Sequence, residues 1–428
     1  MKLFFGALQW TAFIIASAIV VPIAIGQAFE LNQLETAELI QSTFFVLGTT
    51  AFVQCLLGHR LPINESPAGL WWGVYTIYAG LTGTVFASFG ETLQALQGAM
   101  LLSAVFFFFF SLFKIIDQLA VMFTPAVTGI YLLLLVIQLS EPIIKGVMGI
   151  GYRKDEVDGL VFLLAGVIMM ATFLMSKSNV AFFKQYSILV ALFGGWILFA
   201  LFGVAKVPQH TDQFFHMPSL FPFGVPVFDS GLIVTSLFIT MLLIVNMLAS
   251  IRVVEVAVQQ VEKLEERNRA RPAGFIAAAG HLLSGFLGAV GTVPISGAAG
   301  FIQTTRMSSK KPFLLGSFII ILISFFPLVM NLFASLPSPV GFAVNFVVFS
   351  TMIGMAFSEF DSYEASEIGR VRFLIGISLL AGVGVMFVPE SALEGMHPVI
   401  VSILSNGLVL GTMLAIAIEQ IQLRKKKS

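Results

Sequence analysis

Long apolar segments recur from one end of the chain to the other and constrain its fold more than any other feature. Residues 158–176 are typical, because they read "DGLVFLLAGVIMMATFLMS" and hold a single charged residue, at the first position. A helix needs roughly 20 apolar residues to cross the hydrocarbon core of a bilayer. Only 11% of the chain is charged, against roughly 25% in soluble domains, and a soluble protein with a very large core would need more polar surface. The chain is therefore predicted to be an all-α polytopic membrane protein.

Counting these segments predicts about 14 transmembrane spans, of which the third and the tenth are short or broken. The expected spans are 7–27, 39–58, 68–88, 95–113, 119–140, 158–176, 181–203, 230–252, 274–290, 296–306, 312–334, 340–358, 370–388 and 397–421. An even number of spans places both termini on the same side of the membrane.

The positions of Lys and Arg predict the orientation of the spans. With the N-terminus inside, 19 of these residues fall on the inner side and 4 on the outer side. Cytoplasmic loops carry such an excess of Lys and Arg. We therefore expect a multi-pass protein of the cell membrane with both termini in the cytoplasm.

The span count also predicts an internal repeat. A long charged connection, residues 252–274, lies near the middle of the chain and reads as a partly helical cytoplasmic loop. Two halves of seven spans must be inverted relative to each other, because seven is odd. Transporters are often built from such inverted repeats, with the substrate site where broken helices meet. We predict a first repeat in residues 1–206 and a second in residues 207–428.

The two broken spans occupy corresponding positions in these halves. They are "HRLPINESPAGLWWGVY", residues 59–75, and "GTVPISGAAGF", residues 291–301. Irregular backbone at membrane depth is tolerated only where protein buries it or where it lines a cavity. The free backbone groups of both breaks can therefore bind a polar ligand. The alternative is that Gly297 and Gly300 only permit close helix packing, as small residues do in membranes.

Several motifs resemble one transporter family along nearly the whole chain. They are "QCLLGHRLPI" at 54–63, "MFTPAVTGIYLLLL" at 122–135, "VPISGAAGFIQTTRMSSK" at 293–310 and "ILSNGLVLGTMLAIAIEQI" at 403–421. Together they resemble the nucleobase–ascorbate transporters, or nucleobase:cation symporter-2 family, which include uracil and xanthine permeases. The resemblance implies a 7+7 inverted repeat with core and gate domains, and short antiparallel strands in the third and tenth spans. It also implies proton-coupled symport by alternating access and allows a homodimer.

The sequence departs from the family at the residues that hold the substrate. Within the signature motif Gly300, Thr305 and Arg306 match, whereas Gly297 replaces a Gln or Glu and Ala298 replaces an Asn. In the eighth span Ala249 occupies the position of a carboxylate, and no Asp or Glu lies between Asp229 and Val254. The sequence therefore identifies no carboxylate in the expected site.

The remaining candidates for substrate binding are backbone groups and one amide. They are the backbone at Ala68, Gly69, Ser296 and Gly297, with Ala298 and Ala249 beside them. Asn246 lies one turn before Ala249, and its amide can pair with the edge of a base or with another helix. Trp10, Trp71 and Trp72 offer stacking surfaces, although tryptophans in membrane proteins commonly face lipid or pack in the interior.

Two further residues each allow a functional and a structural interpretation. His281, in the ninth span, is a weak candidate for proton coupling because imidazole titrates near neutral pH, but a lone His in a span also serves as a structural hydrogen-bonding group. Arg252 can extend to the cytoplasmic surface with Glu255 as a partner, or it can act as a fixed cation that favours an anionic substrate.

These observations predict a nucleobase permease, for xanthine, urate, hypoxanthine, guanine or uracil. An anion transporter of the same architecture and a membrane scaffold without transport are the alternatives. An enzyme is not expected, because the sequence holds no metal-ligand cluster, nucleophile–His–acid set or phosphate loop. We expect no cofactor and no metal, and the zero net charge points to no nucleic-acid partner.

Overall fold

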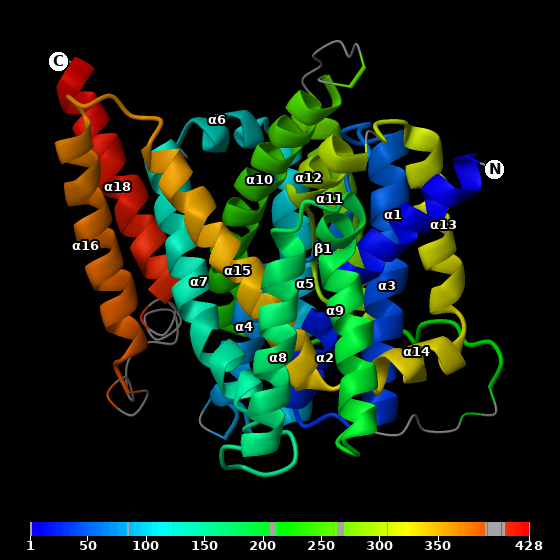
Figure 1. The fold of residues 1–428 in the computed structure, drawn as a ribbon. Helices are drawn as coiled ribbons and strands as arrows, with labels where there is room; N and C mark the ends of the chain where they lie inside the picture. The colour runs from blue at the N-terminus through cyan, green and yellow to red at the C-terminus, as the bar shows by residue number, and fades with distance from the viewer. Residues whose placement is uncertain are drawn as a thin grey trace.

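The computed structural model is almost entirely helical, with one small sheet at its centre (Figure 1). It describes residues 2–83, 85–122, 124–205, 211, 213–259, 261–262, 269–305, 307–389, 392, 404 and 407–427. In these residues, eight helices are long and apolar enough to cross a membrane, or up to nine if a bent pair is counted as one span. The chain is a multi-pass membrane protein. The start of α1 and the end of α18 both lie at the upper end of the molecule (Figure 1).

The elements follow one another in two series. The first series is α1 (Lys2–Ala18), α2 (Val20–Ala28), α3 (Gln33–Leu56), β1 (Glu65–Pro67), α4 (Gly69–Gly80), α5 (Phe89–Leu112), α6 (Ile115–Met122), α7 (Pro125–Val147), α8 (Gly159–Ser176) and α9 (Ala181–Leu201). The second is α10 (Ser230–Gln259), α11 (Ala270–Leu287), β2 (Thr292–Pro294), α12 (Gly297–Thr305), α13 (Lys310–Ser324), α14 (Pro327–Ala334), α15 (Ser338–Phe360), α16 (Ile368–Met386) and α18 (Gly407–Lys427).

Local sequence signals fix where several helices begin. Asn32 and Glu35 form a reciprocal capping box at the start of α3, and Ser88 caps α5. Thr124 caps α7 and is followed by Pro125, whose missing N–H costs nothing at a first helical position. Asp158 accepts two backbone N–H bonds at the start of α8. Each such cap contributes about 1 kcal/mol, because it satisfies donors that the helix itself leaves unpaired.

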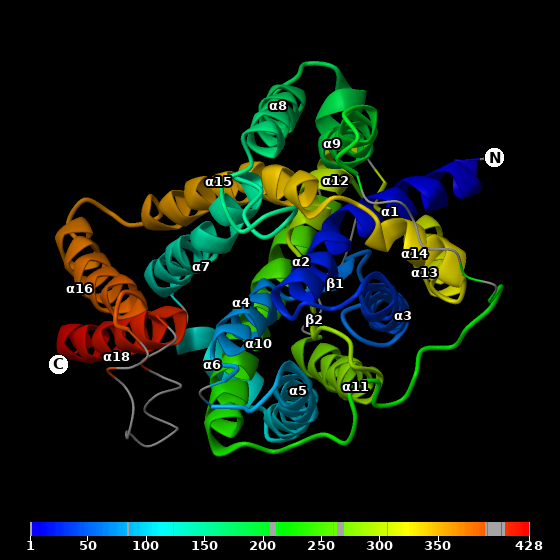
Figure 2. The same ribbon diagram turned by 90° about the horizontal axis from the view of Figure 1, so that it is seen from below.

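The two breaks in the apolar pattern form an antiparallel strand pair, as the resemblance implies. Glu65 lies opposite Pro294, and Pro67 lies opposite Thr292. β1 contacts α1 and α3, whereas β2 contacts α3, α10 and α11 (Figure 2). Proline cannot donate to a ladder, so this pair stays short. At Gly291 an added Cβ would lie 2.6 Å from Cδ1 of Trp71, so only glycine fits where the chain enters β2.

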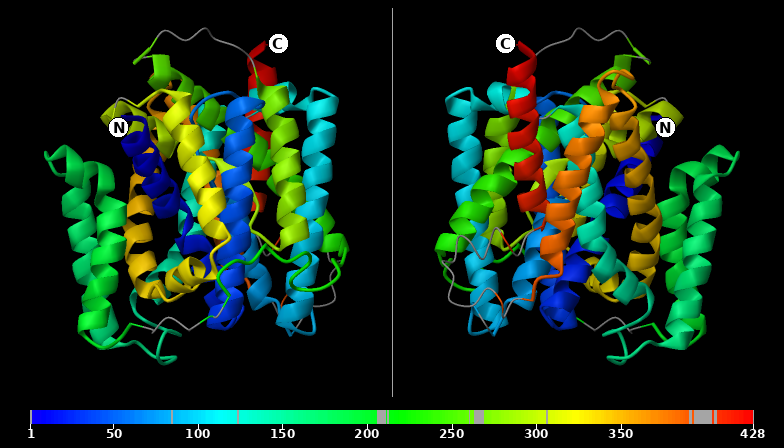
Figure 3. Two further views of the ribbon diagram at one scale, coloured as in Figure 1. Left: turned by 90° about the vertical axis from the view of Figure 1, so that its right-hand side faces the viewer. Right: turned by 90° about the vertical axis from the view of Figure 1, so that its left-hand side faces the viewer.

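The helices pack mainly in two groups. In one group α5 packs on α11, α3 on α13 and α1 on α13; in the other α7 packs on α15 and α18, and α16 on α18. α8 and α9 pair with each other along one side of the molecule (Figure 3). α8 exposes large apolar side chains, including Leu163, Met170 and Leu174. So much exposed apolar surface suits contact with lipid rather than with water.

Three details differ from the sequence prediction. The third span is helical only as far as Gly80, short of residue 88. The eleventh bends by 90° between α13 and α14, because Pro327 lacks the N–H that would continue α13. α6 was not predicted; it follows Lys114, whose positive φ of 61° ends the preceding helical stretch.

Candidate substrate site

The first turns of α4 and α12 follow the two strands directly. Ala68, between β1 and α4, donates its N–H to the Gly291 carbonyl over 2.8 Å, which ties the break of the third span to that of the tenth. Gly69 and Gly297 are the first helical residues, so their N–H groups have no intrahelical partner. Within the described residues these two N–H groups have no other partner either. Both therefore remain available to an acceptor on a ligand.

The glycines at these helix starts have room around them. A Cβ added at Gly297 would meet its nearest atoms, on Ile295 and Phe13, at 3.7 Å, and one added at Gly300 would meet nothing within 4 Å. Elsewhere glycine permits close approach, as at Gly285, where an added Cβ would lie 2.5 Å from Leu101. The close-packing interpretation of Gly297 and Gly300 is therefore wrong.

The other predicted residues near the start of α12 differ in how far they are exposed. Ala68 and Ala298 are fully buried, Ser296 is half-buried, and Gly297 is exposed. The Ala298 N–H is already used in a 3.4 Å bond to the Ile295 carbonyl. The methyl groups of both alanines are therefore enclosed by protein, and the exposed surface here belongs to Gly297.

α10 brings the eighth-span residues to the same region, because it packs on both β2 and α12. Asn246 is half-buried, and its Oδ1 accepts a 3.3 Å bond from Ser250 Oγ, which leaves the amide Nδ2 for another partner. Ala249, one turn later, is exposed. Arg252 is exposed too, and the ion pairs of the described residues do not join it to Glu255.

Thr305, the last residue of α12, has a structural role. Thr305 donates its hydroxyl to the Phe301 carbonyl over 2.7 Å and accepts the Met307 N–H over 3.2 Å. It thereby terminates α12. Arg306 lies outside the described residues.

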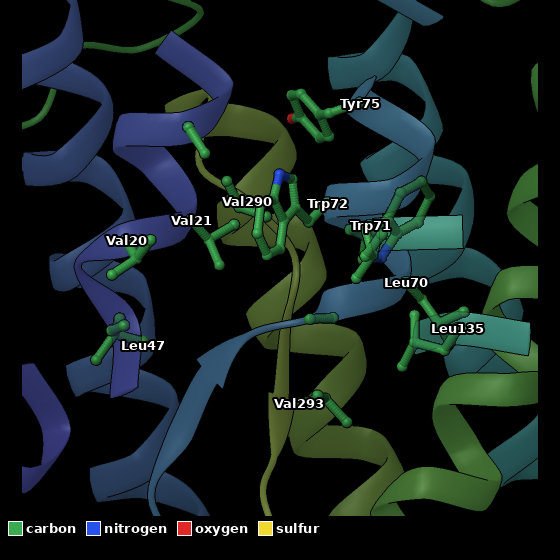
Figure 4. Close-up of a cluster of buried hydrophobic side chains, with 14 of the residues drawn as sticks. Val20, Val21, Leu47, Leu70, Trp71, Trp72, Tyr75, Leu135, Val290 and Val293 are labelled. Carbon is green, nitrogen blue, oxygen red and sulfur yellow. The ribbon is translucent and has the colours of Figure 1, made fainter. Parts of the chain in front are cut away.

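The three tryptophans are buried inside the protein, so the lipid-facing interpretation is wrong for them. Trp10 packs against Phe301, with ring centroids 4.3 Å apart, and against Phe313. Trp71 and Trp72 project from α4 into a cluster with Val290 and Leu135 (Figure 4). Trp72 also approaches Phe342 of α15, which connects the two helix groups. In this conformation they are packing residues.

His281 is completely buried, and both ring nitrogens are engaged. Trp71 donates its indole N–H to Nε2 over 3.2 Å, and Nδ1 lies 3.0 Å from the Ala277 carbonyl. An indole N–H only donates, so Nε2 must accept and the ring proton sits on Nδ1. This pattern requires a neutral imidazole. It favours the structural interpretation of His281.

Sequence reasoning missed Glu65, which is the first residue of β1 and only 1% exposed. Glu65 is thus a buried carboxyl group in the strand pair, whereas Ala249 and Gly297 bring no carboxylate to the expected site. Glu65 lies within the quoted break at 59–75, but in sequence it reads as part of a polar turn, "NESP". Its burial arises from pairing with β2, more than 200 positions later, which the local sequence does not reveal.

A small hollow lies at the boundary of the two helix groups, between α2 and α15. Its lining includes Ile23, Ala24 and Phe342. None of the residues predicted from the sequence lines it. This apolar hollow therefore does not coincide with the residues that the sequence predicts to bind substrate.

Many apolar helices with two interrupted ones among them are typical of membrane transporters. Residues 1–391 match the model Xan_ur_permease, described as the Permease family. The chain belongs to this permease family, whose members are transporters and not enzymes.

Relatives and a solved structure extend this comparison. The chain is 68% identical to "Putative purine permease YwdJ" of Bacillus subtilis (strain 168), over 100% of this chain and 98% of that protein. It is 23% identical to the uric acid permease PucJ of the same organism, over 100% and 94% of the two chains. Its fold is that of the transmembrane domain of the cyanobacterial bicarbonate transporter BicA, with a TM-score of 0.61, 16% identity and 97% of each chain covered.

Proposed function

We propose that this protein is a purine permease and that oxygen-rich purines, uric acid and xanthine, are its preferred substrates. The observation that carries the proposal is the pair of unpartnered N–H groups at Gly69 and Gly297, at the starts of two half-helices. Helix starts carry partial positive charge and donate hydrogen bonds. Since Gly297 and Ala249 offer no carboxylate, the site binds ring carbonyl oxygens better than ring N–H groups. The names of the relatives support the same substrate class.

The half-buried amide of Asn246 completes this proposed site. Its Nδ2 donates to a ring carbonyl or nitrogen, while its Oδ1 is already occupied by Ser250. The exposed methyl of Ala249 leaves space for the ring. Burying an unpaired polar group costs roughly 1–3 kcal/mol, so a purine binds only where most of its edge finds partners.

The proposed architecture is 14 membrane segments in two inverted repeats, residues 1–206 and 207–428. Packing partners support it, because three of the larger helix contacts have counterparts in the other half. α5 packs on α11 as α13 packs on α3; α10 packs on α5 as α1 packs on α13; α8 pairs with α9 as α16 pairs with α18. Each broken span contributes one strand and one half-helix.

Transport then proceeds by alternating access. α1–α5 and α10–α14, which include both broken spans, form the core domain. α7–α9 with α15, α16 and α18 form the gate domain. Binding sites between two such units open to either side as the units rock against each other. Both termini lie in the cytoplasm, as the excess of Lys and Arg on that side supports. A homodimer in the cell membrane, with proton-coupled uptake, completes the proposal.

The test is uptake of labelled uric acid, xanthine, hypoxanthine, guanine and uracil by cells that lack their own permeases, with and without a protonophore. We expect saturable uptake of uric acid or xanthine that exceeds uptake of the other three and that the protonophore abolishes. No uptake of any of the five would overturn the purine assignment. Uptake that persists with the protonophore would overturn proton coupling only.

Anion transport is the second candidate, because the fold is shared with a bicarbonate transporter. At 16% identity this likeness concerns the fold alone. Bicarbonate or chloride flux through purified protein in liposomes, without purine uptake, would favour this candidate. A scaffold without transport would show neither flux nor any stabilisation by the five bases.

A further inference from the structure

A carboxyl side chain is buried at the centre of the molecule, where the two broken spans meet. Glu65 is on β1, which pairs with β2. Its Oε1 is buried and has no hydrogen-bond partner in the described part of the chain. Thr292, on β2, lies diagonally across the strand pair from Glu65, because Glu65 is opposite Pro294 and Pro67 is opposite Thr292. Glu65 therefore links the third-span break to the tenth-span break through a side chain that can change its charge.

The strand alternation separates Glu65 from the polar contacts of its neighbours. Asn64 donates to the Ser17 hydroxyl over 3.0 Å, and Ser66 donates to the Ser17 carbonyl over 2.8 Å, so both point toward α1. Successive side chains of a strand point to opposite faces. Glu65 and Thr292 consequently share the other face of the sheet, away from α1.

Among the described residues, no ion pair joins Glu65 to a charged group on the elements that pack on β1. α1 holds only Lys2, at its first position, and β2 holds no titratable residue. α3 holds two acids in its first two turns, Glu35 and Glu38, and one thiol, Cys55, near its other end. His281, on α11 beside β2, is a neutral hydrogen-bonding partner of Trp71. An isolated buried carboxylate is costly, and such groups bind a proton instead.

We propose that Glu65 is the group that carries the coupled proton through this transporter. This proposal rests on the proposed function, namely proton-coupled purine transport. In this proposal the Glu65 carboxyl group, on β1, takes the role of the carboxylates that are absent at Ala249 and Gly297.

The Thr292 hydroxyl, on the same face of the strand pair, couples the proton to the two broken spans. An ionised carboxylate only accepts, so a Thr292 hydroxyl that bonds to it donates. After one carboxylate oxygen takes a proton from water on the entry side, the new O–H can donate to Thr292 instead. On the exit side the O–H bond breaks and the proton returns to water. Since Pro67 lies two positions before Gly69 and Thr292 lies five before Gly297, this exchange acts directly on the chain that presents both free N–H groups.

The test uses purified full-length protein in liposomes, with uric acid and xanthine as substrates. An imposed pH gradient should drive accumulation by the wild type. Glu65→Gln should lose this accumulation at least tenfold while it still exchanges labelled for unlabelled substrate across the membrane. Glu38→Gln, an exposed carboxylate on neighbouring α3, is the matched control and should accumulate substrate as the wild type does. Glu65→Asp, which keeps a titrating group, should retain gradient-driven accumulation.

Several outcomes decide between the proposals. Gradient-driven accumulation by Glu65→Gln at the wild-type level would overturn the role of Glu65 and leave the purine assignment intact. A wild type that neither accumulates nor exchanges purines would overturn both.

A spectroscopic measurement covers the case in which Glu65→Gln loses exchange as well. Infrared spectra of wild type and variant then show whether a protonated-carboxyl band disappears with Glu65. Its disappearance supports the proposal, whereas identical spectra overturn it.

Discussion

Trp71 donates its indole N–H to Nε2 of His281 over 3.2 Å, and this bond joins α4 to α11. Gly291 makes the contact sterically possible, because an added Cβ there would lie 2.9 Å from the same Nε2. Phe107 of α5 covers the imidazole, with ring centroids 4.8 Å apart. The pair thus fixes the first half-helix to the second half of the chain and keeps the imidazole neutral.

This arrangement predicts that His281 stabilises the fold and does not couple protons. His281→Phe should lower the unfolding free energy by about 1–3 kcal/mol, because the buried Trp71 N–H loses its acceptor. Protonophore-sensitive uptake by the folded fraction should remain. Thermal unfolding in detergent and uptake by cells measure the two effects. An equally stable variant with uncoupled uptake would contradict this prediction.

The room around Gly297 predicts that its substitutions affect the substrate rather than the fold. Gly297→Leu should raise KM for uric acid or xanthine at least tenfold, because its side chain occupies the space beside the free N–H. Its unfolding midpoint should stay close to that of the wild type. Gly297→Ala, whose Cβ meets only ordinary contacts at 3.7 Å, should bind more nearly as the wild type does.

Gly291→Ala is the matched control for that experiment. Its Cβ would lie 2.6 Å from Cδ1 of Trp71, and overpacking of this kind costs about 1–3 kcal/mol. This variant should therefore lose stability first. An unchanged KM in Gly297→Leu would show that substrate does not approach the start of α12.

The surroundings of Asp158 predict how acid changes the stability of the loop between α7 and α8. Burial raises its pKa, but hydrogen bonds from Arg153 and from the backbone N–H groups of Val161 and Leu160 outweigh burial and hold the pKa below its usual value. A folded-state pKa below the unfolded one gives stability that is present above the unfolded value, about 3.9. This stability is lost as the pH falls through the lowered folded pKa.

The variants separate the charge of Asp158 from its capping role. Asp158→Asn retains a good helix cap but loses the ion pair, so its stability should depend less on pH in the acid range than that of the wild type. Asp158→Ala should lose about 1 kcal/mol more, since Ala cannot cap α8. Unfolding midpoints between neutral and acid pH provide the measurement. Parallel pH profiles for wild type and Asp158→Asn would contradict the assignment.

The apolar periods and helix-breaking residues predicted much of this fold because they act locally. Most expected spans overlap an observed helix, and "GTVPISGAAGF" marks a strand followed by the start of α12. The bend before Pro327 was missed, because its flanking residues are as apolar as a straight span.

The site was less predictable, because its properties arise from residues far apart in the chain. Glu65 and Thr292 become neighbours only through strand pairing. The burial of Trp72 depends on Phe342 of α15. The motif at 293–310 located the tenth-span element, but it did not indicate that a carboxylate from the third span lies against it.

A buried carboxylate in another part of the molecule, Glu419 on α18, provides the last prediction. It pairs with Arg370 of α16 and accepts a 3.1 Å bond from Thr124 at the start of α7. The Glu419 side chain is 1% exposed and that of Arg370 is 20% exposed. This network therefore joins three helices of the proposed gate domain.

Removing one partner should destabilise the gate domain more than removing both. Glu419→Leu leaves the Arg370 guanidinium without its carboxylate, and breaking a buried pair in this way costs about 3–5 kcal/mol. Arg370→Met combined with Glu419→Leu removes both charges and keeps apolar volume, so it should recover most of that loss. Thermal unfolding of the two single variants and the double variant gives the coupling free energy directly. Additive losses would show that the two side chains do not depend on each other, although the structure places them in contact.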